Sequence, residues 1–205
     1  DLSAWKVDSV KNMRNLFANC QQFTGTGLNG WKVDKVTDMS GMFRDCYAFT
    51  EDLKGWKVGN VTDFSLMFYN NRSVATDFTH WDVSSGKYFN NMFAGCNILN
   101  GNSLKFWNVA NGVNFDKMFN GVKTFNGDLS DWRPRSAETT RYMFANCTAF
   151  ATELSNWSVE NVVDAEAMFL GCENFVSDIS GWKFKNLQNI SQMFKSASKF
   201  NHDLG

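Results

Sequence analysis

The sequence has only one proline and two histidines among its 205 residues. His80 and His202 stand far apart, so a zinc site or a histidine-based catalytic pair lacks its usual ligands. No P-loop, G-x-S-x-G or H-E-x-x-H motif is present. These absences argue against the common hydrolases and metalloenzymes, and we expect no enzyme activity, no cofactor and no metal site.

An excess of charge of one sign is also missing. The chain carries 20 basic and 21 acidic side chains, a net charge of −1, which offers no basic surface for nucleic acid or an anionic membrane. No stretch approaches the roughly 20 apolar residues of a membrane span, and no signal peptide stands at Asp1. We therefore expect no nucleic-acid partner and no direct membrane span in this segment.

A repeat is what the chain has in abundance. Eight tryptophans follow one another at intervals of 25 or 26 residues, and each is followed twelve residues later by a phenylalanine. We expect these two columns to form the structural core: Trp5, Trp31, Trp56, Trp81, Trp107, Trp132, Trp157 and Trp182, with Phe17, Phe43, Phe68, Phe93, Phe119, Phe144, Phe169 and Phe194. A fixed period of this length over a whole chain is typical of a solenoid.

The consensus of the repeat is L-x-x-W-x-V-x-x-V-x-x-M-x-x-M-F-x-x-C-x-x-F, which Leu28–Phe49 matches at every position. The alternation in W-x-V predicts a short strand, and the apolar residues at positions 0, 3, 6, 7 and 10 of V-x-x-M-x-x-M-F-x-x-C predict one face of a short helix. The predicted fold is an α/β solenoid of about eight coils, similar to leucine-rich repeats, with short parallel strands on one face and short helices on the other. Pro134 replaces a valine in coil six, which predicts a local break in the ladder.

We expect residues 1–205 to form a single continuous array. No linker or low-complexity tract divides it, and the first and last residues fall at the same phase of the repeat. Solenoids need polar capping coils at their ends, and neither end of this sequence departs from the repeat pattern as a capping coil would. The chain is therefore predicted to be a segment of a longer array.

The pattern resembles the BspA-like leucine-rich repeats of the DUF285 type, a 25-residue repeat of microbial surface proteins and mycoplasma lipoproteins. Coil three carries the resemblance in Trp56-Lys57-Val58, Asn60-Val61-Thr62-Asp63, Met67-Phe68 and Asp52-Leu53. The resemblance covers the whole chain and implies a noncatalytic role in adhesion or partner recognition, extracellular or at the cell surface. It implies no catalytic residues.

Two further columns of the repeat consist of side chains that could form covalent bonds or bind a metal ion. All five cysteines stand three residues after the repeated Phe, an arrangement that predicts buried free thiols instead of disulfides. An acidic column includes Asp52, Asp77 and Asp128. Each of its carboxylates accepts backbone N–H groups at the corner entering the strand, contributes to a stacked Ca²⁺ site, or is simply solvated, and the sequence leaves these readings open.

The residues on either side of each Trp are predicted to point outward and to form the binding surface, because W-x-V alternates. They vary while the core columns repeat. The candidate binding residues are Lys6, Lys32, Lys57, His80, Asp82, Phe106, Asn108 and Arg133. Two coils also carry one extra residue, at Thr24–Gly27 and Asn100–Ser103, where bulged turns are expected.

The sequence thus favours a noncatalytic extracellular or cell-surface recognition protein that binds a protein or glycan partner through its sheet face. The alternative is a structural building block of an extracellular fibre, sheath or lattice, in which further copies stack end to end. Those copies would then be its partners.

Overall fold

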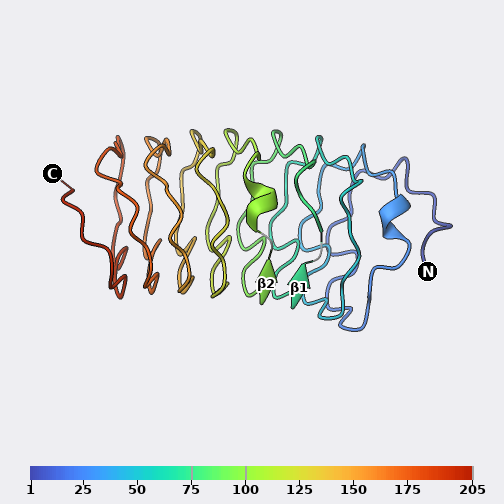
Figure 1. Ribbon diagram of the computed structural model, residues 1–205. Helices are drawn as coiled ribbons and strands as arrows, with labels where there is room; N and C mark the ends of the chain where they lie inside the picture. The colour runs from blue at the N-terminus through green and yellow to red at the C-terminus, as the bar shows by residue number, and fades with distance from the viewer. Residues whose placement is uncertain (75, 100, 205) are drawn as a thin grey trace.

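The structure is a computed structural model that describes residues 1–74, 76–99 and 101–204. Its coils stack along one axis, with the two termini at opposite ends of the stack (Figure 1). One cluster of buried hydrophobic residues extends from the first coil to the last. The predicted repeat solenoid is confirmed, whereas its α/β details are not.

Regular secondary structure is scarce. The described residues contain two short 3₁₀ helices, η1 (Leu28–Gly30) and η2 (Gly101–Leu104), and two strands, β1 (Ser73–Val74) and β2 (Ile98–Leu99). The strands pair in parallel, first residue opposite first residue. Elsewhere one isolated parallel bridge per coil joins neighbours, at Asn12, Asp38, Asp63, Tyr88, Asn114, Thr139, Asp164 and Asn189.

The helix predicted in each coil is wrong, because this segment forms consecutive tight turns. In coil two the amides of Met42, Arg44 and Cys46 donate to the carbonyl three residues before them, at 3.1, 3.1 and 3.2 Å. The alternate amides donate to carbonyl oxygens of coil three, and they belong to Met39, Gly41, Phe43 and Asp45. Amides that bind within the coil therefore alternate with amides that bind the next coil.

In the turn segment of each coil, two residues adopt positive φ, one two positions before the repeated Phe and one two positions after it. The second set consists of Asn19, Asp45, Asn70, Gly95, Gly121, Asn146, Gly171 and Ser196. A residue with positive φ ends an α-helix. The apolar residues three apart are instead the first and last residues of turns, so they face inward while the two residues between them form the corner.

The W-x-V segment is not a strand within the described ranges. In coil three the Trp56 amide donates to the Leu53 carbonyl and the Val61 amide to the Val58 carbonyl, each at 2.9 Å, so two turns flank the segment. The link between coils comes from the Trp side chain. Each indole Nε1 donates to the carbonyl of the residue three before the previous Trp, at 2.8–3.1 Å, from Trp31, Trp56, Trp81, Trp107, Trp132, Trp157 and Trp182.

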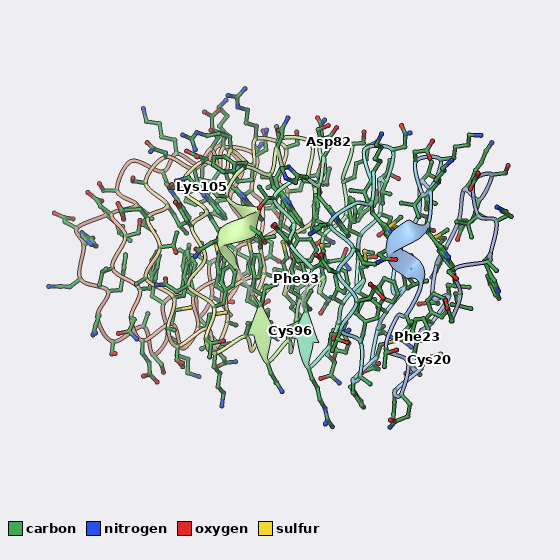
Figure 2. All side chains as sticks on the ribbon, turned by 45° about the vertical axis from the view of Figure 1, so that its right-hand side comes forward. Cys20, Phe23, Asp82, Phe93, Cys96 and Lys105 are labelled. Atoms are coloured by element: carbon green, nitrogen blue, oxygen red, sulfur yellow. The ribbon has the colours of Figure 1, made fainter. Side chains whose placement is uncertain are left out.

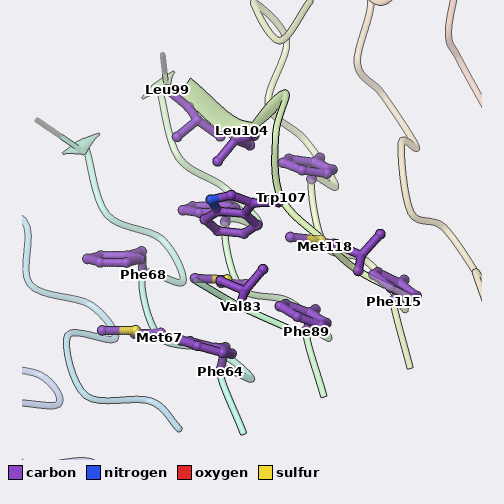
Figure 3. Close-up of a cluster of buried hydrophobic side chains, with 14 of the residues drawn as sticks. Phe64, Met67, Phe68, Val83, Phe89, Leu99, Leu104, Trp107, Phe115 and Met118 are labelled. Carbon is purple, nitrogen blue, oxygen red and sulfur yellow. The ribbon is translucent and has the colours of Figure 1, made fainter. Parts of the chain in front are cut away.

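The aromatic columns fill the interior. Phe68 and Phe93 stack with ring centroids 5.8 Å apart and planes 1° apart, and this spacing recurs along the column. Figure 3 shows Trp107 and its neighbours packed in the same interior. Seven of the eight tryptophans are buried, but Trp5 is 55% exposed, because no described coil lies beyond it. Phe17 and Phe194, in the two end coils, are half-buried.

Each 3₁₀ helix lies at one of the two places where the repeat gains a residue. The first insertion leads into η1 through Gly27, whose φ is 93°. The second lies at η2, where a Cβ on Gly101 would stand 2.7 Å from the Cα of Gly127 in the next coil. Glycine is therefore required there for two backbones to meet. Figure 1 shows both helices on the same side of the stack.

The break predicted at Pro134 is wrong. Isolated bridges continue from coil five through coil six to coil seven. The Ala137 amide donates to the Pro134 carbonyl at 3.1 Å, as the Val36 amide donates to the Val33 carbonyl in coil two. Proline keeps the carbonyl that this turn uses, and its fixed φ suits a turn.

Candidate functional site

The surface around the Trp column is formed by the two turns L-x-x-W and V-x-x-V. We call the residues immediately before and after each Trp the Trp-flank face. From Trp31 onward, each indole points into the core to reach the preceding coil, so its two neighbours lie outside. Figure 2 shows Asp82, which follows Trp81, at the rim of the array, with Phe93 in the interior.

All eight candidate binding residues belong to this face, which is defined by their position next to a Trp. Seven are exposed, namely Lys6, Lys32, Lys57, His80, Asp82, Phe106 and Asn108. Phe106 has 70% of its surface exposed, more than any other large hydrophobic residue described. Arg133 is half-buried, because its Nη1 donates to the carbonyls of Ser130 and Trp132, both at 2.8 Å.

One groove lies between coils five and six and brings together Phe106, Asn108 and Arg133, with a volume of about 450 Å³. We call it the central groove. Two charged residues of its lining, Lys105 and Arg135, were missed by sequence reasoning, and Asp131 was not among the eight candidates. Asp131 stands directly before Trp132, so the prediction that both neighbours of each Trp point outward already placed it on this surface.

A second groove, of about 360 Å³, combines Lys32 and Lys57 with Trp31, Asp34 and Gly55. We call it the N-terminal groove. A Cβ on Gly55 would meet only one carbonyl oxygen, 3.9 Å away. Packing therefore does not demand glycine here, and the missing side chain keeps the groove open.

The remaining candidates lie outside both grooves. Lys6, His80 and Asp82 line neither one. Asp82 is engaged locally, since its Oδ1 accepts the Ser84 amide at 3.0 Å. Hydrogen bonds from Ser84 lower the pKa of this carboxyl.

An ion pair borders the central groove. The Nζ of Lys105 lies 2.7 Å from Oδ2 of Asp128 and 5.9 Å from the centre of the Phe106 ring. Hydrogen bonds from Lys105 and Ser130 lower the pKa of the Asp128 carboxyl to about 2. Asp128 therefore stays ionised at any ordinary pH and compensates the Lys105 charge.

The acidic column caps turns. Each carboxylate below accepts the backbone amide two residues later, at 2.9–3.0 Å: Asp1, Asp52, Asp77, Asp128 and Asp178. This confirms the reading in which they accept backbone N–H groups. Across residues 1–74, 76–99 and 101–204, no group of three or more His, Cys, Asp or Glu could hold a metal ion.

The cysteine column provides no exposed nucleophile beyond Cys20. All five thiols are free, and the other four are buried. Burial raises the pKa of the Cys46, Cys96 and Cys172 thiols to about 12. Their Sγ–H groups donate to carbonyls of the preceding coil, for instance Cys46 to Phe17 at 2.9 Å. A protonated, buried thiol does not act as a nucleophile.

Comparison with known proteins points to one family. The family described as "Mycoplasma protein of unknown function, DUF285" matches residues 1–106, 73–174 and 138–205. No curated protein matches the chain.

Among solved structures, a leucine-rich repeat protein from Bacteroides ovatus is similar at 14% identity and a TM-score of 0.29. The alignment covers 94% of this chain and 63% of that one, so the chain spans less than two thirds of its length. At this TM-score we transfer nothing from its structure.

In the described part of the chain, no helix is both long and apolar enough to cross a membrane.

Proposed function

The chain belongs to the DUF285 family, and we propose that it is a noncatalytic recognition protein that binds a protein or glycan partner through the Trp-flank face. One observation carries the proposal. Each groove begins just after the 3₁₀ helix that accompanies an insertion, the N-terminal groove after η1 and the central groove after η2. Insertions in repeat proteins commonly mark the working edge.

The contrast between interior and surface supports this function. Inside, the same residue types recur and the indole donors find partners in the preceding coil. On the Trp-flank face, Gly55, Phe106 and Asp131 occupy equivalent positions with unrelated chemistry. A rigid, repeated core with a varied surface suits selective binding, because the binding groups are held in place before a partner arrives.

We propose an extracellular or cell-surface location, in keeping with the resemblance to repeats of microbial surface proteins. Protease treatment of intact cells tests this location. An extracellular array is cleaved or released while a cytoplasmic marker protein stays intact, and survival of the array in intact cells contradicts the proposal.

Site-specific photo-crosslinking tests the binding face. We would place a photoreactive amino acid at Lys32 or Asn108 on the Trp-flank face, and at Arg14 or Lys195 on the turn segment as matched exposed controls. We expect the same partner to be captured from surface extracts at the first two positions and not at the controls. Equal capture at all four positions, or capture only at Arg14 and Lys195, rules out the face.

A substitution at Gly55 sharpens the same test. Gly55→Tyr places a ring in the N-terminal groove, and its Cβ meets only a carbonyl oxygen 3.9 Å away, so folding should be unchanged and capture at Lys32 should fall. Lys195→Tyr is the control for adding an exposed ring elsewhere. Undiminished capture by Gly55→Tyr would show that this groove is not used.

The structural building block remains a second candidate because of the end faces. Trp5 and Leu16 are 55% and 42% exposed in coil one, and Ile190 is 55% exposed in coil eight, although these columns are mostly buried between coils. A second copy stacked end to end would cover them. Light scattering that rises with concentration, and falls in Trp5→Glu, supports stacking, whereas a monomer at all concentrations refutes it.

A further inference from the structure

The central groove combines an exposed aromatic ring with fixed positive charge. Phe106 projects from coil five, and Arg133 and Arg135 approach from coil six. The groove is open and crosses two coils. An open groove of about 450 Å³ suits one or two units of a chain passing over the surface, not an enclosed small molecule.

The guanidinium groups of Arg133 and Arg135 can both bind a ligand, but only that of Arg133 is held in place by hydrogen bonds. Two hydrogen bonds to backbone carbonyls hold the Nη1 end of Arg133, so the rest of its guanidinium is positioned before any ligand arrives. Arg135 is exposed. Across the described ranges, neither guanidinium forms an ion pair with a carboxylate.

The charge of the groove is modest and favours an anion. Lys105 is already paired with Asp128, which leaves Arg133 and Arg135 against the single carboxylate of Asp131. Guanidinium groups bind carboxylates through paired, charge-assisted hydrogen bonds. One net positive charge suits one carboxylate per binding unit, and it does not suit a phosphate backbone, which calls for an extended basic stripe.

The other polar groups suit hydroxyls. Asn108 uses its Oδ1 to accept the Ala110 amide at 3.2 Å, which leaves its NH₂ group to donate. Asp131 offers an acceptor to hydroxyl groups on the same ligand. The Phe106 ring presents a flat apolar surface with 70% exposure, on which the C–H face of a sugar ring can lie.

We propose that the central groove binds an acidic glycan, with a sugar ring on Phe106 and its carboxylate between Arg133 and Arg135. This inference rests on the proposed recognition function and names its ligand class. A peptide is less well served, because β-strand addition needs a continuous free strand, and the described segments that line the groove contain no strand.

Calorimetric titration tests the ligand class with matched probes. Tetragalacturonate carries a carboxylate on every ring, its methyl ester keeps the rings but loses the charge, and tetra-aspartate keeps the charge without rings. We expect the wild-type chain to bind tetragalacturonate, and to bind the other two at least about tenfold more weakly. Equal binding of tetra-aspartate would indicate an acidic peptide and overturn the proposal.

Variants assign the site. Phe106→Ser and Arg135→Gln should each weaken tetragalacturonate binding about tenfold, whereas Phe106→Tyr should retain it. Tyr88→Ser removes an exposed ring at another phase of the repeat, and Lys35→Gln an exposed charge in coil two. These two controls should bind as the wild type does. Thermal melting shows that each variant is folded.

The outcome of the glycan titration can be distinguished from the outcome of the crosslinking test of the recognition function. If tetragalacturonate fails to bind while crosslinking from Asn108 still captures a partner, the glycan inference falls and the recognition function stands. If binding occurs but is unaffected by Phe106→Ser and Arg135→Gln, the groove is not the site. If neither probe nor partner binds, both proposals fall.

Discussion

Coils six and seven and coils three and four fill the same core position in different ways. In coils six and seven, Phe150 and Phe175 stack with centroids 6.0 Å apart and planes 5° apart. In coils three and four that position holds Val74 and Leu99, which belong to the paired strands β1 and β2. The column is buried in both regions, so the fold tolerates the loss of two rings.

Phe78 supplies the missing ring from another column. It occupies the position held by Leu53 and Leu104 in the coils on either side. Its ring meets Phe68 and Phe93 edge-on, at 5.8 and 5.4 Å. In the regular coils those contacts come from the last Phe of the repeat. The comparison shows that side chains of different columns together fill the same volume of the core. The residue type in any one column can therefore change.

A second difference is polar. Asn71 replaces the cysteine of coil three and is fully buried, and neither its Oδ1 nor its Nδ2 has a hydrogen-bond partner among the described residues. In coil six, Cys147 donates to the Phe119 carbonyl at 3.0 Å. An unsatisfied buried amide costs stability, so we expect coil three to be the weaker of the two.

The largest expected effect is that of Trp107→Ala, which separates the two regions. Trp107 contacts Phe78 edge-on at 5.6 Å and stacks on Trp132 at 6.3 Å, so it joins coil four to coil six. We expect a loss of about 3–5 kcal/mol and unfolding in two phases, because coils interact only with their neighbours. Urea unfolding followed by hydrogen exchange measures this.

Trp182→Ala is the control, since Trp182 lies in the last coil and its loss should only fray that end. A single sharp transition for Trp107→Ala would show that the coils are coupled more tightly than nearest-neighbour packing allows.

Phe78→Leu should have the next largest effect. Leucine is usual at this position, so a consensus argument expects a neutral or stabilising change. We expect destabilisation by about 1–3 kcal/mol, because the ring that replaces two absent phenylalanines is lost. Adding Val74→Phe should recover part of it, and a double-mutant cycle in urea measures the coupling. If Phe78→Leu is neutral, the compensation between columns is refuted.

Asn71→Cys should stabilise the chain by about 1–2 kcal/mol, because it removes an unsatisfied amide and adds a thiol donor. The Phe43 carbonyl is the expected acceptor, by analogy with Cys46 and Phe17. Val122→Cys is the matched control: its position already holds a buried apolar residue, so its stability should hardly change. Chemical unfolding compares the two, and equal gains would contradict a penalty specific to Asn71.

The sequence allowed the number of coils, the aromatic core and the free thiols to be predicted, because each depends on residue type at a fixed spacing. The helix prediction failed since apolar residues three apart also satisfy consecutive turns. The signal against a helix was the column two residues after the repeated Phe, which includes Asn19, Gly95 and Gly171 and suits positive φ. Each groove is lined by residues of two neighbouring coils. The pattern of a single repeat therefore did not predict that Phe106 and Arg135 would line the same groove.

The smallest expected effect concerns the Lys105–Asp128 pair, which joins coil five to coil six. The folded pKa of Asp128 is lowered to about 2 from an ordinary 3.8, so its contribution is fully present above pH 3.8 and is lost as the pH falls through 2. Lys105→Met should therefore lower Tm slightly at pH 7, and the difference from the wild type should shrink towards zero below pH 2. It should also shrink in high salt, because both side chains are more than a third exposed.

Lys54→Met is the control from the irregular region: its pair with Asp52 lies within one coil at 3.7 Å, and its loss should change Tm less. A Tm difference for Lys105→Met that persists unchanged at pH 1.5 would mean that lost packing of the lysine stem, not the ion pair, sets the effect.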